Sequence, residues 1–284
     1  MTDGDLDALL AAHGLSAYAD RVRPYHLPCT WLTLCEPCDG AAPGSRVAGW
    51  PLLPPGYAWL LDEEGSRMNF VLQLDLAALA PLPGIALPAR GLMSVFVGSI
   101  SPAHGWQFLV LLTPVGASLA PRAPPGLDEA HAGELDDIFA GLAPHRLAAV
   151  RGHDFPRWAS GDHVELTWDM PDALQDSYSE GFLAALDPDR AVAKLGGHVE
   201  GIGEDPRRMA CSAEEPDLGR LHDQAPQRTP GLPGVAGWRN LLMVDSCRTV
   251  NLCIGDAGYL QFMGRTDALA AGDFGSLYTT LESS

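Results

Sequence analysis

Most hydrophobic runs in this chain are short and alternate with polar residues, which is the pattern of half-buried β-strands. Glycine or proline bounds several of them, as in "GLMSVFVG" and "WQFLVLLTP". The pattern predicts strands at residues 29–34, at the start of 69–80, and at 91–98, 106–114, 162–171, 239–246, 249–255 and 258–264.

Three segments instead show helical spacing or helix-capping signals. Residues 3–23 place leucines near a 3.6-residue period behind an aspartate that can cap the start. Residues 127–145 begin acidic and end near a glycine and a proline, and residues 177–186 open with a Ser–x–x–Glu capping box. The glycine-rich residues 194–206 and the turn-rich residues 212–238 are predicted to be loops.

Two parts of the chain resemble each other. "NFVLQLDLAAL" followed by "GLMSVFVG" is similar to "NLLMVDS" followed by "GYLQFMGRTDAL", and the first strand of each pair runs into an aspartate, Asp75 or Asp245. A duplication and a chance likeness between hairpins both explain this. The predicted fold class is α+β, a largely antiparallel sheet built from two similar β-units with peripheral helices. The predicted domains are an N-terminal helical segment, 1–28, and a single domain, 29–284, whose β-rich halves span about 29–120 and 160–284.

Composition indicates the class of protein and its cellular location. A chain of 284 residues that is 46% hydrophobic can bury a large core. No apolar run approaches the ~20 residues of a membrane helix, and the acidic start "MTDGDLDALLAAHGL" lacks the basic region of a signal peptide. We therefore expect a soluble, cytoplasmic protein.

The formal net charge is −18, from 36 acidic and 18 basic residues, of which only Lys194 is a lysine. A chain this acidic repels phosphate backbones and anionic membrane surfaces, so nucleic acid and membrane are not expected partners. Solubility alone is the favoured explanation. A basic protein partner or a cationic small-molecule ligand is the functional alternative.

The stretch "SRVAGWPLLPPGYAWL", residues 45–60, is too interrupted for a helix and too rich in proline for a central strand. Its prolines stiffen an extended run, and its tryptophans, Trp50 and Trp59, can either cover a sheet or wall a ligand pocket. Covering the sheet is the favoured interpretation.

Four ordered blocks give the chain a family resemblance: residues 45–60, "FVLQLDLAAL" with "LPARGLMSVFVG", "KLGGHVEGIGEDP", and "LLMVDS" with the C-terminal stretch that begins "GDAGYLQFMG". Together they resemble the YwqG-like proteins of the DUF1963 domain family over roughly residues 30–284. The resemblance implies an α+β fold with a largely antiparallel sheet and an intracellular setting. Because some relatives sit near toxin–immunity systems, it also implies a possible immunity-type role.

The cysteines offer one metal candidate. Cys35 and Cys38 form a Cys–x–x–Cys pair that can chelate zinc, and His26, Cys29, His198 or Cys211 could complete the site. A redox role would need a helix after the pair, which the sequence does not indicate. Ordinary thiols are the favoured interpretation.

Two polar sets could form a binding or catalytic pocket. His198 lies in "GGHVEG" beside Gly197, Glu200 and Asp205, where glycines permit close approach to a ligand, although a solvated loop is favoured. The second set lies near strand ends in the two similar units, where carboxylates could meet to bind a cation or share a proton, although turn capping is favoured. Its members are Gln73, Asp75, Asp245 and Asp256.

A weaker pattern, His163 and Glu165 on one face of the predicted strand 162–171 near His153 and Asp154, could also form a metal or acid–base site.

Two functions remain. No nucleophile elbow, Walker loop, Rossmann fingerprint or HExxH is present, which favours a binding or interaction protein whose ligand or protein partner is unknown. The alternative is a metal- or carboxylate-dependent enzyme that acts on a small cationic substrate. Its expected catalytic residues are Asp75, His198, Asp245 and Asp256. The ligand contacts expected for either function are Trp50, Trp59, Gln73, Gly197, Glu200 and Asp205. The identity of any cofactor is left unknown by the sequence.

Overall fold

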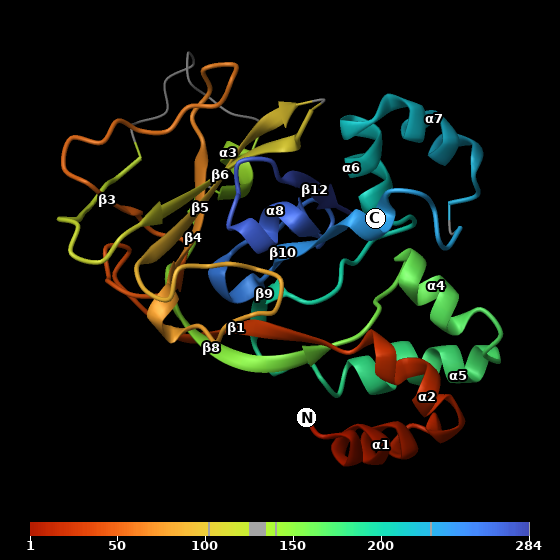
Figure 1. The fold of residues 1–284 in the computed structure, drawn as a ribbon. Helices are drawn as coiled ribbons and strands as arrows, with labels where there is room; N and C mark the ends of the chain where they lie inside the picture. Colours follow the sequence, from red (N-terminus) through yellow and green to blue (C-terminus); the bar gives the residue numbers. More distant parts are fainter. Residues whose placement is uncertain (102, 125–134, 140, 228, 284) are drawn as a thin grey trace.

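The computed structural model describes residues 1–101, 103–124, 135–139, 141–227 and 229–283. Ten strands close into a barrel, and a group of helices lies against one side of it (Figure 1). The order around the barrel is β1-β8-β2-β4-β5-β6-β12-β11-β10-β9. Every neighbouring pair is antiparallel except β12 and β6, which are parallel.

The barrel strands are β1 (Leu27–Pro37), β2 (Arg46–Val47), β4 (Asn69–Asp75), β5 (Leu92–Ser101), β6 (Gly105–Thr113), β8 (His145–Asp154), β9 (Ala191–Gly196), β10 (Trp238–Asp245), β11 (Tyr259–Arg265) and β12 (Tyr278–Glu282). A separate two-stranded sheet pairs β3 (Leu52–Leu53) with β7 (Ala120–Pro121). The short helices α3 (Asp136–Phe139) and α8 (Thr266–Ala271) occur between strands in the sequence and are not part of either sheet.

Hydrophobic side chains fill the barrel. One continuous cluster takes buried residues from eight strands, including Leu32, Leu72, Val95, Leu195 and Phe262, and partly buried side chains of β6 and β12 pack against it. Because strand side chains alternate between two faces, the residues between these point outward. The interior is therefore a packed hydrophobic core.

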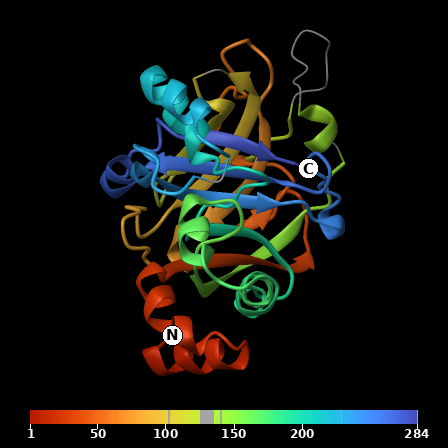
Figure 2. The same cartoon turned by 90° about the vertical axis from the view of Figure 1, so that its right-hand side faces the viewer.

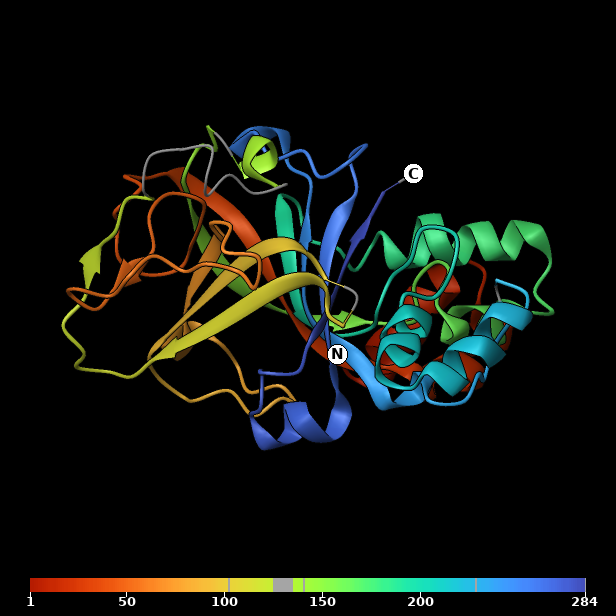
Figure 3. The same cartoon turned by 90° about the horizontal axis from the view of Figure 1, so that it is seen from above.

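The helices on one side of the barrel form what we call the helical lobe (Figures 2 and 3). Its first part packs around Leu10, Phe155, Leu166, Tyr178 and Phe182. It comprises α1 (Asp3–Ala12), α2 (Ala19–Val22), α4 (Gly161–Thr167), α5 (Asp172–Asp176) and the π-helix Ser177–Leu183. Its second part comprises α6 (Arg207–Glu214) and α7 (Pro216–Gln224). Among the described residues, no helix is both long and apolar enough to cross a membrane.

The predicted α+β class with a mostly antiparallel sheet is confirmed, and the strands predicted at residues 29–34, 91–98, 106–114, 239–246 and 258–264 are present. The strand predicted from residue 69 is β4, and helical structure is present within residues 3–23 and 177–186. The helix predicted at 127–145 is described only in part, because residues 127–134 and 140 lie outside the described part of the chain. Its described residues include α3.

Three element predictions are wrong. Residues 162–171 begin as helix α4, because the Ser160 side chain caps the His163 N–H, and the buried His163, Leu166 and Thr167 also fit helical spacing. Residues 249–255 form a turn and not a strand, with Asn251 at φ +60° and a single isolated bridge between Leu252 and Cys247. Within the predicted loop 212–238, most of residues 212–224 is helical, and Pro216 begins α7 in the first-turn position that proline favours.

The segment 45–60 starts in barrel strand β2, and its later residues, from Leu53 to Leu60, pack against side chains of β4, β5 and β6. Trp59 donates its indole N–H to the Met68 carbonyl at 3.0 Å and packs edge-on against Phe96, with ring centroids 6.3 Å apart. The buried Gln73 side chain fastens the segment from within: its Oε1 accepts the Leu52 N–H at 3.1 Å, and its Nε2 donates to the Gly44 carbonyl at 2.9 Å. Trp50, by contrast, is 45% exposed.

We predict that Trp59→Ala lowers the free energy of unfolding by about 2–3 kcal/mol, because it removes ring packing and one hydrogen bond. Trp50→Ala is the matched control and should cost less than about 1 kcal/mol, because that side chain is exposed. Urea unfolding measures both. Equal losses would contradict the different positions of the two rings.

Candidate functional site

A buried charge cluster lies between the barrel wall and the helical lobe. Lys194 is fully buried on the outward face of β9, opposite Trp31 of β1. Its Nζ lies 2.8 Å from Asp154 Oδ2 and 3.6 Å from Glu200 Oε1. Asp154, the last residue of β8, is also fully buried. A charge so completely removed from water requires such an opposite charge.

Arg157 completes the cluster. Its Nε lies 2.7 Å from Asp154 Oδ1 and 3.0 Å from Glu200 Oε1, and its two terminal nitrogens bind both carboxylate oxygens of Asp187. The Trp31 ring lies 5.3 Å from the Arg157 guanidinium carbon and 5.4 Å from Lys194 Nζ, within cation–π range. Every charged group of the cluster therefore has a partner inside it.

The electrostatics follow from burial and pairing. Burial alone would raise the pKa of Asp154, but Lys194 and Arg157 hold that pKa well below its ordinary value. Burial alone would lower the pKa of Lys194, but Asp154 and Glu200 raise it above its ordinary value. Both groups are therefore charged at neutral pH.

Gly197 lets the loop after β9 approach this cluster. Its φ is +76°, and a Cβ at this position would overlap Asp154 Oδ2. The next residue, His198, donates its backbone N–H to the same oxygen at 2.8 Å. A glycine is thus required where the chain turns over the buried carboxylate.

His198 is buried and faces the N-terminal part of the lobe. Its Nε2 lies 2.7 Å from the Tyr25 carbonyl, which can only accept, so Nε2 carries a proton. Burial lowers the pKa of His198 despite the nearby Asp154. The imidazole is therefore neutral at neutral pH and joins two segments as a hydrogen-bond donor.

We call residues 197–205 the tethered loop, because its backbone is bonded to several elements. The Glu200 N–H donates to Gln261 Oε1 at 2.9 Å, and Gln261 Nε2 returns a bond to the Glu200 carbonyl at 2.9 Å. The Gly201 N–H donates to the Trp158 carbonyl at 3.1 Å, and the Ile202 N–H donates to Glu282 Oε2 at 3.1 Å.

Asp205 anchors the far end of the tethered loop. Its Oδ2 accepts the Gly161 N–H at 2.7 Å and an Arg207 terminal nitrogen at 2.6 Å. Arg207 also bonds Asp162 of α4 at 3.0 Å. Desolvation opposes the charge of Arg207, but these two carboxylates raise the Arg207 pKa above its ordinary value. The loop therefore begins and ends on buried carboxylates.

Asp245 lies at the end of β10, close enough to Glu200, Lys194 and Arg157 to feel their charges. Burial, and then the negative charge of Glu200, raise its pKa to about 7. Among the described residues its side chain makes no hydrogen bond, and it is only partly exposed. Asp245 is thus a carboxyl group that exchanges its proton near neutral pH.

Five of the residues predicted for the site lie in this region: Gly197, His198, Glu200, Asp205 and Asp245. Asp75 does not join them, because β4 and β10 are five strands apart in a ring of ten and lie on opposite walls. The Asp75 side chain accepts the Ala77 N–H at 3.0 Å and caps a short 3-10 helix. Asp256 lies in an exposed turn, where its N–H donates to Ser283 Oγ.

The remaining predicted contacts lie elsewhere. Gln73 and Trp59 hold the covering segment of the barrel, as described above, and Trp50 lines a surface cavity of about 360 Å³ with Phe70 and Phe139. Within the described ranges, no group of three His, Cys, Asp or Glu side chains is arranged to hold a metal ion. A metal role for Cys35 and Cys38 stays a prediction.

Sequence reasoning did not select Lys194 or Arg157, and treated Asp154 only as a neighbour of His153. One signal was available: Lys194 is the single lysine of the chain and interrupts the apolar strand "AVAKLG". A lone lysine in a strand that is otherwise apolar indicates a buried charge with a dedicated partner.

We predict that Gly197→Ala destabilises the protein by about 2 kcal/mol or more beyond the control Gly56→Ala. Gly56 has nearly the same φ, +77°, but open space around the added Cβ, so the difference isolates the overlap with Asp154. Thermal unfolding of the two variants measures it. Equal melting temperatures would show that the loop does not depend on close approach to Asp154.

Comparison with known proteins identifies the family of the chain. The profile described as "Domain of unknown function (DUF1963)" matches residues 45–110 and 137–282. No curated protein matches the chain. The matched residues include most barrel strands, Asp154, Lys194 and the whole tethered loop. The match covers well over half of the sequence and confirms the resemblance seen in its four blocks, so the chain belongs to the DUF1963 family.

Proposed function

We propose that this chain is a non-enzymatic binding protein whose tethered loop recognises a positively charged partner. The observation that carries the proposal is the fixation of this loop. Four of its backbone N–H groups, those of His198, Glu200, Gly201 and Ile202, bond to four separate parts of the fold. A loop with this many bonds keeps one conformation before a partner arrives.

Pre-organisation favours binding because less conformational entropy is lost when the partner docks. The tethered loop also offers something to contact: Ile202 is 39% exposed. The charges of Arg157 and Lys194, by contrast, are already used by Asp154, Asp187 and Glu200. The cluster therefore supports the loop better than it would serve a reaction.

Charge favours a basic partner. The whole chain carries a net charge of −18, and this excess comes from the wider surface, because Asp187 and Glu204 at the two edges of the loop region pair with Arg157 and Arg208. A negative surface of this kind steers a cationic protein toward it and speeds encounter. An immunity-type role against a basic toxin, in the cytoplasm, is one concrete form of the proposal.

We predict that an affinity column of the full chain retains a basic protein from the native lysate at low salt. The variant Ile202→Arg should lose it, because a bulky cation then stands in the tethered loop. Ile100→Arg is the matched control, since Ile100 is 56% exposed at the end of β5, and it should retain the partner. The proposal fails if nothing is retained above background, or if both variants retain the same protein equally.

A second candidate function rests on Asp245. A carboxyl group with a pKa near 7, partly exposed and beside Lys194 and Glu200, has the property that a general acid–base catalyst needs. The corresponding proposal is a carboxylate-dependent enzyme acting on a small cationic substrate, with His198 as a hydrogen-bond donor nearby. Metal analysis of the purified protein tests its metal-dependent form.

We predict that Asp245→Asn stabilises the protein increasingly as pH rises from about 4 to about 7. The folded pKa of about 7 exceeds the ordinary 3.8, so the folded state binds the proton more tightly and loses stability as the carboxyl ionises over this window. The gain above pH 7 should be on the order of 3 kcal/mol and vanish near pH 4.

Chemical denaturation at several pH values measures this difference, with Asp256→Asn, in an exposed turn, as the control. A constant difference between Asp245→Asn and the wild type across the range would remove the acid–base candidate, because Asp245 would then be ionised throughout.

The other sequence predictions are kept as proposals. The two hairpins β4–β5 and β10–β11 are proposed to descend from one β-unit, within a single domain spanning 29–284. Trp50 is proposed as a contact in its own cavity. The predicted ligand contacts of Trp59 and Gln73, the catalytic roles of Asp75 and Asp256, and a zinc role for Cys35 and Cys38 stay predictions.

A further inference from the structure

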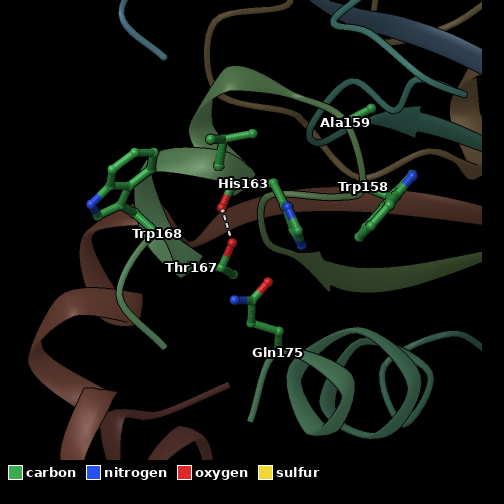
Figure 4. A pocket seen from close by; sticks show the side chains of 7 residues that line it. Trp158, Ala159, His163, Thr167, Trp168 and Gln175 are labelled. Carbon is green, nitrogen blue, oxygen red and sulfur yellow. Dashed lines mark hydrogen bonds between the residues drawn. The ribbon is translucent and has the colours of Figure 1, made fainter. Parts of the chain in front are cut away.

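A pocket of about 170 Å³ opens on the helical lobe between two exposed tryptophans (Figure 4). Trp158 and Trp168 are 48% and 77% exposed, and they stand on opposite sides of His163. Helices α4 and α5 supply the rest of the lining, including Thr167 and Gln175. Cavities of about 150 Å³ can hold a molecule the size of benzene, so this pocket suits one small group.

The two indole rings need an explanation. Tryptophan side chains are normally well buried, and two that are partly exposed around one hollow line it with electron-rich aromatic surface. His163, only 3% exposed, supports the pocket from below by stacking edge-on against Trp158, with ring centroids 5.5 Å apart. The pocket is therefore built on a fixed aromatic base.

The polar groups of the lining are largely engaged within the protein. The Thr167 hydroxyl donates to the His163 carbonyl at 2.8 Å, and Gln175 Nε2 donates to the Met170 carbonyl at 2.9 Å. Ligands that depend on many directed hydrogen bonds, such as sugars, would find few donors here. A ligand held by aromatic rings and by charge does not need such donors.

The segment of chain that lines the pocket is acidic. Residues 158–186, which supply the whole lining, carry six carboxylates and no lysine or arginine. Asp162 pairs with Arg207 and Asp169 with Arg21. The other four have no ion-pair partner among the described residues; they are Glu165, Asp172, Asp176 and Glu180. This field repels anions and attracts cations.

We propose that this pocket binds an organic ammonium group, with a quaternary ammonium as the best fit, in the hollow that Trp158 and Trp168 line. Such a group is recognised by aromatic faces and needs no hydrogen-bond donor from the protein. The group can come from a small molecule such as choline or from a trimethylated lysine side chain. The pocket shares no lining residue with the tethered loop, although the two meet at the Trp158 backbone, and neither proposal depends on the other.

The test titrates choline chloride into the full chain at constant ionic strength, followed by ligand-observed NMR. We expect saturable binding in the millimolar range, and at least about fivefold weaker binding by 3,3-dimethylbutan-1-ol, the neutral molecule of the same shape. A second arm uses a short peptide with one trimethylated lysine. Tighter binding of either probe identifies the source of the ammonium group.

Trp168→Ala is the informative variant, because the exposed ring can be removed without opening the core; it should weaken choline binding about fivefold or more. Val115→Ala removes another highly exposed apolar side chain, 68% exposed and outside the lining of this pocket, and should leave binding unchanged. The proposal is overturned if choline does not bind, if the neutral analogue binds equally well, or if Trp168→Ala has no effect.

Discussion

Asp154 is fully buried where the chain leaves the barrel for the lobe, and its charge must be neutralised there. The chain crosses between the two parts near residues 26–27, 154–155, 187–191, 196–197 and 237–238. Groups bonded to Asp154, directly or through one neighbour, hold all but the last of these crossings. Lys194 and the His198 N–H bind Asp154 itself, Arg157 extends the network to Asp187, and the His198 ring reaches Tyr25.

We call the boundary between the barrel wall and the helical lobe the seam. The bonds of Asp154 explain why this seam is charged instead of apolar. A hydrophobic seam of similar size would be as stable or more so, because burying ions costs desolvation energy. A charged seam, however, penalises every wrong docking of the lobe, since any shift leaves a buried carboxylate or ammonium without its partner. We infer that the cluster fixes the position of the lobe, and with it the shape of the tethered loop that starts on the same carboxylate.

Alternation and turn residues predicted most barrel strands, because their hydrophobic faces fill one closed interior and the period-2 pattern survives in the sequence. At residues 162–167 the pattern wrongly predicted a strand, because the spacing of the hydrophobic residues fits a strand and a helix equally well. The N-cap at Ser160 favours the helix. Half of the site was predictable from the glycine-rich block around His198. The roles of Lys194 and Arg157 were not predictable, because they depend on Asp154. Asp154 lies 40 residues from Lys194 in the sequence and meets it only in the folded barrel.

The same cluster also shapes the outer surface of the lobe. With a net charge of −18, the chain has few cations to distribute, and it places Lys194 and Arg157 inside the seam. Their charges are cancelled by Asp154, Asp187 and Glu200, so they contribute little to the outward field. Four carboxylates of α4, α5 and the π-helix therefore have no ion-pair partner among the described residues: Glu165, Asp172, Asp176 and Glu180. Salt separates the two effects, because it screens exposed charges strongly and buried pairs weakly. Cation binding at the lobe should then fade with salt while the seam keeps the lobe in place.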